Sequence, residues 1–215
     1  MSFGYLGDTS TKIKQQVKNQ GVISISEAYE LEKAGHLGGS LELIESQTVS
    51  GVSSVNFTNI KGGKYDVHLL QLLNISTSDD NEEIQIRLSN DSGSTYESSG
   101  YHDARDQGNA GGSFNQLKST SADAITIANA IGNATNEKGH SYCYLYSLNN
   151  SSKFSFTTTH SVLLNNTSVF NFDYGIGVYP VAETINAIQV LLDDSSNITG
   201  TIKLFGVKQW VTLDF

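Results

Sequence analysis

The last part of the sequence constrains the fold most, because apolar and polar residues alternate there in two short runs. The first run places Ile188, Val190 and Leu192 on one face, and the second does the same with Ile202 and Leu204. A period of two is the pattern of β-strands, and the Asp, Ser, Asn and Gly residues between the runs suit a chain reversal. We therefore predict a closing β-hairpin that is inserted into a sheet and completes a β-sandwich.

The composition of the whole chain favours the same class. Of its 215 residues, 38% are hydrophobic and 16% are charged, and Ser, Thr, Asn and Gly make up much of the rest. Such residues suit short strands and turns, whereas they disfavour helices. The chain is long enough for one domain with a sizeable core. Aromatic residues, including 10 Tyr and 9 Phe, recur along it and argue against disorder.

Strand patterns follow one another from residue 39 onward. Before the closing pair, we expect strands near residues 41–45, 55–57, 65–73, 84–88, 124–128, 141–148, 154–160, 169–172 and 175–181. This spacing is typical of an all-β antiparallel sandwich or a barrel. The run 65–73 is apolar on both faces, which fits a central strand covered on one side by a partner. Residues 91–115 are rich in Gly, Ser, Asp and Asn, so we expect a long loop there.

The first 38 residues differ from the rest. Ser24 and Glu27 have the spacing of a capping box, which predicts a short helix that Gly35 would end. A single helix of about ten residues is not stable alone in water, so it must dock on something. We expect residues 1–38 to be an assembly segment and 39–215 to be the β-sandwich domain. The larger apolar side chains that would make the assembly contacts are Tyr5, Ile13, Val17, Ile25, Tyr29 and Leu31.

The charge and the cysteine content exclude several classes of function. The net charge of −9 argues against binding to nucleic acid or to an anionic membrane surface. No apolar run approaches the ~20 residues of a membrane-spanning helix. The first residues lack the basic and apolar regions of a secretory signal. The single cysteine, Cys143, lies in a strand pattern and is expected to be a small buried apolar residue.

The five histidines do not show the spacing of a metal site. No pair lies four residues apart and no HExxH occurs, so we expect no metal and no cofactor. His68 and His160 fall within strands and should be satisfied by hydrogen bonds. The stretch 102–106 (HDARD) fits acid–base chemistry or calcium binding, but we favour a surface loop with an internal ion pair. The stretch 193–197 (DDSSN) is either a calcium-binding loop or a turn.

The clearest candidates for ligand binding are residues scattered through the expected long loop. Tyr96, Tyr101, His102 and Phe114 could face a ligand and stack on sugars, or they could belong to the core or to a subunit interface. No nucleophile elbow or phosphate-binding loop occurs. A glycan-degrading enzyme stays open, because its two carboxylates need no sequence motif.

Four stretches carry a family resemblance: residues 1–7 (MSFGYLG), 38–45 (GGSLELIE), 64–68 (KYDVH) and the closing region from Ile185 through 200–206 (GTIKLFG). These stretches resemble an uncharacterised family of virion structural proteins from tailed phages of marine bacteria, including cyanophages. The resemblance runs nearly from end to end and is carried by about a quarter of the chain. It implies assembly rather than catalysis.

The resemblance implies a virion subunit made in the host bacterial cytoplasm and anchored to the particle through residues 1–38. It would be a capsid decoration protein or a component of the tail or a fibre, in contact with other virion proteins. By analogy of fold, viral sandwiches suggest a jelly roll and a homotrimer or other homo-oligomer. The alternative is a carbohydrate- or receptor-binding module that recognises a host surface glycan.

Overall fold

The computed structural model describes residues 25–33, 40–194 and 196–208. The chain divides into two units, Met1–Ser40 and Leu41–Phe215, and we describe each by itself. The division lies two residues beyond the boundary expected from the sequence. In the first unit the described residues form one helix, α2 (Ile25–Lys33). Ser24 of the expected capping box lies outside the described residues.

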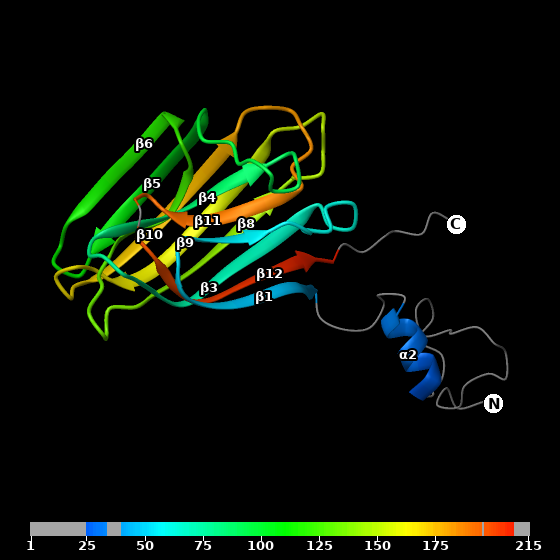
Figure 1. The fold of residues 1–215 in the computed structure, drawn as a ribbon, viewed down its shortest axis with the longest axis horizontal. Coiled ribbons are helices and arrows are strands. Elements are labelled where there is room, and N and C mark those ends of the chain that lie inside the picture. Colours follow the sequence, from blue (N-terminus) through cyan, green and yellow to red (C-terminus); the bar gives the residue numbers. More distant parts are fainter. Residues whose placement is uncertain (1–24, 34–39, 195, 209–215) are drawn as a thin grey trace, which may run out of the picture. The chain divides into compact units, whose positions relative to one another are not determined.

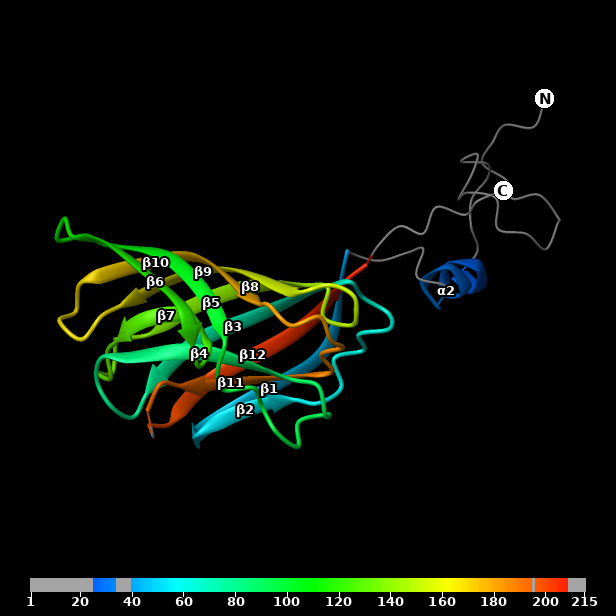
Figure 2. The ribbon, with the colours of Figure 1, turned by 90° about the horizontal axis from the view of Figure 1, so that it is seen from above.

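In the second unit the described residues form twelve strands in two antiparallel sheets that pack face to face (Figure 1, Figure 2). The expected all-β antiparallel sandwich is therefore confirmed. In chain order the strands are β1 (Leu41–Val52), β2 (Ser54–Phe57), β3 (Val67–Thr77), β4 (Glu82–Ser89), β5 (Tyr101–Asn109), β6 (Phe114–Ala122), β7 (Ile125–Ile131), β8 (Gly139–Tyr146), β9 (Ser155–Leu164), β10 (Phe170–Tyr179), β11 (Ala187–Leu192) and β12 (Ile198–Val207).

Eight of these strands form a jelly roll. They form four antiparallel pairs: β1 with β12, β2 with β11, β3 with β8, and β4 with β7. Each pair lies within the previous one in the sequence, as in a single long hairpin. Successive pairs alternate between the sheets, so the hairpin is rolled up into two layers. The smaller sheet has the order β2-β11-β4-β7, and the larger one begins β1-β12-β3-β8. This nesting is the topology of a jelly roll, which confirms that expectation.

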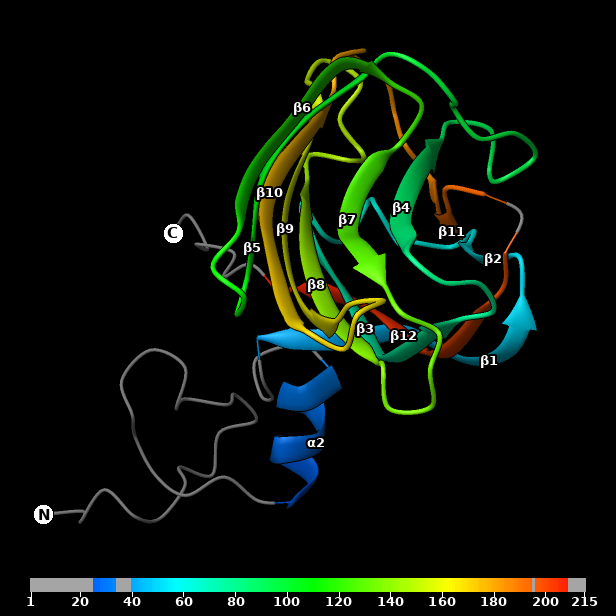
Figure 3. The ribbon, with the colours of Figure 1, turned by 90° about the vertical axis from the view of Figure 1, so that its left-hand side faces the viewer.

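Two inserted hairpins enlarge one sheet only. The β5–β6 hairpin lies between β4 and β7 in the chain, and β9–β10 lies between β8 and β11. Both continue the larger sheet beyond β8, in the order β9-β10-β5-β6. The larger sheet has eight strands against four, and it bends around the smaller one (Figure 3). One face of the larger sheet is therefore turned away from the core.

The core between the sheets is aliphatic under the jelly-roll strands. Ile86, Ile188 and Val190 of the smaller sheet and Leu72 and Leu204 of the larger one are fully buried. Burial of each such side chain contributes about 1.5–3 kcal/mol.

Small residues replace aliphatic ones where the inserted strands pack against β7. A Cβ atom on Gly177 of β10 would lie 2.6 Å from Cγ2 of Ile125, so only glycine allows this close approach. Thr157 and Thr159 of β9 are also buried. The core thus becomes smaller and more polar toward β5.

The prediction of a closing hairpin is wrong. β11 and β12 are both strands, and their apolar faces point inward as expected, but they lie in opposite sheets. β11 pairs with β2 and β4, whereas β12 pairs with β1 and β3. The alternation of residues fixes which face of a strand is buried and does not fix its partner.

The expected long loop at residues 91–115 is partly wrong, because residues 91–100 and 110–113 lie outside strands and the rest do not. Tyr101–Asn109 is strand β5, and Phe114 begins β6, which pairs with β5 over seven positions. None of the nine residues of β6 is buried, because β6 is the edge strand beyond the smaller sheet. An edge strand that is exposed to solvent on both faces has no alternation of apolar and polar residues, so its sequence resembles that of a loop.

Candidate functional site

The outward face of the larger sheet carries the most distinctive surface of the sandwich. We define the outer patch as every second residue of four stretches in β3, β8, β9 and β10: Val67–Leu73, His140–Tyr146, Phe156–Val162 and Phe172–Val178. Successive side chains along a strand point to opposite faces, so these positions all face outward. The residues between them are mostly buried in the sandwich.

A row of aromatic rings crosses the centre of the outer patch. The register aligns Gln71, Tyr142, His160 and Tyr174 on four neighbouring strands. The Tyr142 hydroxyl lies 3.0 Å from Nδ1 of His160, and the two ring centroids are 5.5 Å apart. The His160 and Tyr174 rings meet edge to face at 5.8 Å. These contacts hold the rings in fixed positions on a rigid sheet.

The outer patch exposes a large apolar area for an isolated subunit. Tyr142, Phe156 and Tyr174 are 43%, 50% and 57% exposed, and Ile176 and Val162 are 56% and 40% exposed. Half of an aromatic side chain is roughly 100 Å², so the three rings alone expose about 300 Å². The largest apolar patch on a typical monomer is about 300–600 Å² and is often an interaction site.

The charge of the outer patch differs from that of the chain. The structure describes every residue of the patch, and none is Asp, Glu, Lys or Arg. The whole chain nevertheless has a net charge of −9. The outer patch itself thus has no acidic residue, and depletion of charge is typical of the centre of an interface.

A groove of about 700 Å³ adjoins the outer patch on β9, β10, β5 and β6. Phe156, Ile176 and Val178 of the patch line one side, and His102 and Lys118 line the other. The groove is mainly apolar and has room for part of an extended chain.

The four residues expected to face a ligand do not form one site. His102 and Phe114 are exposed, and Phe114 is 74% exposed on β6. Tyr101 does not face a ligand but belongs to the core, the alternative kept open from the sequence, because it is fully buried. Its hydroxyl accepts a hydrogen bond from the Leu88 amide at 2.9 Å and donates one to the Glu97 carbonyl at 3.1 Å.

Tyr96 is the fourth of these residues and is half-buried in the segment between β4 and β5. A Cβ atom on Gly93 would lie 2.9 Å from its hydroxyl. Tyr96 therefore packs on its own segment and does not join His102 and Phe114.

The residues expected to make assembly contacts are only partly described. Ile25 and Tyr29 lie four residues apart on α2 and are 91% and 63% exposed, so both are on one side of the helix. Tyr5, Ile13 and Val17 lie outside the described residues, as does the side chain of Leu31. Their assembly role stays a prediction.

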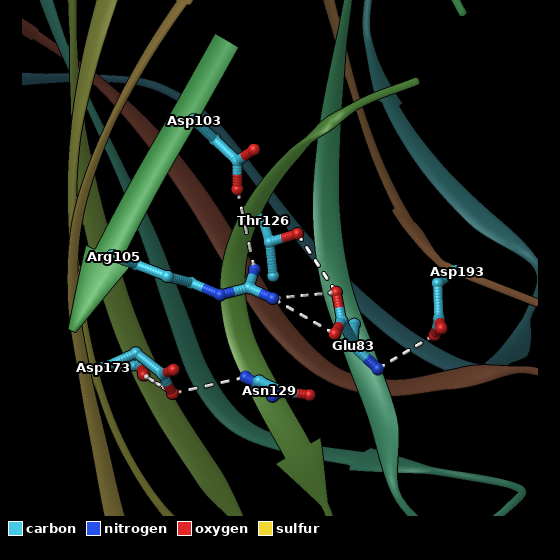
Figure 4. Close-up of polar contacts among 8 residues, drawn as sticks. Glu83, Asp103, Arg105, Thr126, Asn129, Asp173 and Asp193 are labelled. Atoms are coloured by element: carbon cyan, nitrogen blue, oxygen red, sulfur yellow. Dashed lines mark hydrogen bonds and ion pairs between the residues drawn. The ribbon is translucent and has the colours of Figure 1, made fainter. Parts of the chain in front are cut away.

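A polar cluster lies between the sheets, where the inserted strands extend beyond β7 (Figure 4). The Arg105 side chain, which is 8% exposed, donates from Nη2 to Glu83 Oε1 at 3.1 Å. Its Nη1 lies 3.9 Å from Asp103 Oδ2. Thr126 donates a hydrogen bond to Glu83 at 3.1 Å. The expected ion pair within residues 102–106 is therefore present, but it lies on a strand and faces inward.

Asp173 on β10 completes this cluster. It is fully buried, and its Oδ2 accepts hydrogen bonds from the Asn129 amide and the Ser161 hydroxyl at 3.2 and 3.1 Å. Burial raises the pKa of Asp173, while these hydrogen bonds and Arg105 oppose the rise. Burial also raises the pKa of Asp103, again opposed by Arg105. The guanidinium of Arg105 thus contacts two carboxylates, Glu83 and Asp103, and acts on Asp173 only through its charge.

The cluster leaves the expectation of a glycan-degrading enzyme open without favouring it. Glu83 and Asp103 both line a cleft of about 240 Å³ and both contact Arg105, so they lie within the ~10 Å that two catalytic carboxylates require. However, the guanidinium occupies the space between them where a sugar or a water would react. The arrangement is that of a structural ion cluster.

Burial and local hydrogen bonds explain the environments of the other buried titratable groups. His68 is buried and lies 2.8 Å from the Ile60 carbonyl through Nε2, which confirms that expectation. Burial raises the pKa of the Cys143 thiol to about 12, as fits an inert core cysteine. Burial beside Asp194 raises the pKa of Glu82 to about 7. No group of three or more His, Cys, Asp or Glu in the described part of the chain could hold a metal ion.

Comparisons of the chain with protein-family models, with curated proteins and with solved structures found no match. Among the described residues, no helix is long and apolar enough to span a membrane.

Sequence reasoning predicted no partner or ligand role for Tyr142 or Tyr174, and it named His160 only as a satisfied strand histidine. It did predict a partner on one side of residues 65–73, which form part of the outer patch. The signal was nevertheless present, since Tyr142, Tyr144 and Tyr146 alternate with smaller residues and therefore share one face. The two apolar faces of 65–73 are observed as well, with Leu69 facing outward at 5% exposure.

Proposed function

We propose that this protein is a structural subunit of a phage virion, built into the capsid surface, the tail or a fibre. The observation that carries the proposal is the outer patch: a rigid, uncharged aromatic face that favours burial against other protein. The resemblance of residues 1–7, 38–45 and the closing stretch to virion proteins supports the same function. The jelly roll agrees with it by analogy of fold alone.

In this proposal residues 1–38 anchor the sandwich to a neighbouring virion protein. A nine-residue helix that exposes Ile25 and Tyr29 supports this role, because such a helix is not stable without a partner. The sandwich, by contrast, has its own core within Leu41–Phe215.

Deletion of residues 1–38 is expected to reduce incorporation into particles at least tenfold. The measurement is the copy number per purified virion, determined by quantitative mass spectrometry after complementation with the truncated chain. Circular dichroism and thermal unfolding of the truncated protein should match those of the full chain. Incorporation at the wild-type level would show that the segment is not the anchor.

A second candidate is recognition of a host glycan, which the groove beside His102 supports because it offers a preformed site. His102→Ala and Lys118→Ala would weaken glycan binding at least fivefold in a glycan array followed by calorimetry. Asn56→Asp, an exposed substitution on β2 in the smaller sheet, is the control. Equal binding by all variants would count against the groove as the site.

A further inference from the structure

We propose that the outer patch binds the outer patch of a second copy of this chain. The inference rests on the proposed function and names the partner of the same surface. The two larger sheets would meet face to face across the row formed by Tyr142, His160 and Tyr174.

The hydrogen-bonding groups of the patch favour an identical partner. The Tyr142 and Tyr174 hydroxyls, the His160 imidazole and the Gln71 amide can each donate and accept a hydrogen bond. A surface with such groups can pair with itself. Lysine and arginine only donate and carboxylates only accept, so faces rich in them need a different, complementary partner.

The charge distribution also favours an identical partner. In a two-fold interface a residue near the axis meets its own copy, so any charge there would face a like charge. The outer patch, which is described in full, has no Asp, Glu, Lys or Arg although the chain carries a net charge of −9. The nearest charges in the central row stand at its two ends, where Asp106 follows Tyr174 and Lys203 precedes Gln71. Repulsion between copies is thus avoided on this face.

The outer patch supplies a substantial part of the area that a stable contact needs. A standard interface buries about 800 Å² on each partner. The three most exposed rings supply about 300 Å² of this. Ile176, Val162 and the rest of the patch extend the same surface over four strands. The rigid sheet also keeps the entropic cost of association low, because few side chains need to be ordered.

The test measures self-association of the full chain by sedimentation equilibrium and light scattering. The wild type should form an oligomer. Tyr174→Glu places a carboxylate in the contact and should weaken association at least tenfold. Tyr174→Phe keeps the ring and should retain most of it. Asn56→Asp adds the same charge on the smaller sheet and should leave it unchanged. Thermal unfolding checks that Tyr174→Glu is folded.

Two outcomes overturn the inference. A wild-type chain that is monomeric at all concentrations contradicts it, as does a Tyr174→Glu chain that associates normally. If the monomer is still incorporated into particles, another virion protein covers the patch, so the inference fails and the proposed function stands. If the chain oligomerises through the patch but is absent from particles, the proposed function fails instead.

Discussion

Replacement of Tyr101 by alanine is expected to lower the free energy of unfolding by about 3–5 kcal/mol, the range for deleting a large buried aromatic side chain. Tyr101 is fully buried, and its ring packs on Tyr179 at a centroid distance of 5.1 Å. The substitution also leaves the Leu88 amide without its acceptor, which costs more because the group is buried. Equilibrium denaturation by urea measures the change.

Two variants separate the components of this effect. Tyr101→Phe keeps the ring and removes only the hydroxyl, so a loss of about 1–3 kcal/mol is expected. Phe114→Ala removes an aromatic ring that is 74% exposed, and its effect should stay within about 0.5 kcal/mol. A Tyr101→Ala protein of normal stability that had lost ligand binding would show that Tyr101 faces a ligand after all.

Tyr101 shows what sequence alone could and could not provide. The alternation of Ile84, Ile86 and Leu88 identified a strand correctly, because its inner face is uniformly apolar. The stretch around Tyr101 has no such pattern, since β5 faces polar groups inward at Asp103 and Arg105. A polar interior strand next to an edge strand is indistinguishable from a loop by periodicity.

The pairing of the strands could not be predicted from the sequence either. The nearness of β11 and β12 in the chain favoured a hairpin, yet the rolled jelly roll sends them to opposite sheets. Non-local pairs such as β1 with β12 are separated by most of the chain, and nothing in the local pattern specifies them. The outer patch depends on one such pair, β3 with β8, which places Gln71 beside Tyr142. Tyr142, His160 and Tyr174 lie on the consecutive strands β8, β9 and β10, and they are aligned by a register that the local pattern does not specify either.

Replacement of Arg105 by methionine is expected to destabilise the protein by about 3–5 kcal/mol at pH 7, because it leaves buried charge without a partner. Arg105 is the cation that contacts both Glu83 and Asp103, and it also lowers the pKa of the buried Asp173. Lys118→Met removes an exposed cation beside the same cleft and should change stability by less than about 0.5 kcal/mol.

The pH dependence identifies the cause. Burial raises the pKa of Asp103 and Asp173 in the folded state above the ordinary value of about 3.9. A raised folded pKa favours folding at pH values below the unfolded pKa, and this contribution is lost as pH rises through the folded pKa. Removal of Arg105 raises both pKa values further, so the loss of stability in Arg105→Met should shrink as the pH falls from 7 toward 4.

A loss of stability that is independent of pH would mean that Arg105 acts by packing its aliphatic stem rather than by charge. In a double-mutant cycle, Asp103→Asn should then restore nothing, whereas the ion cluster predicts that it recovers at least 1 kcal/mol in the Arg105→Met background.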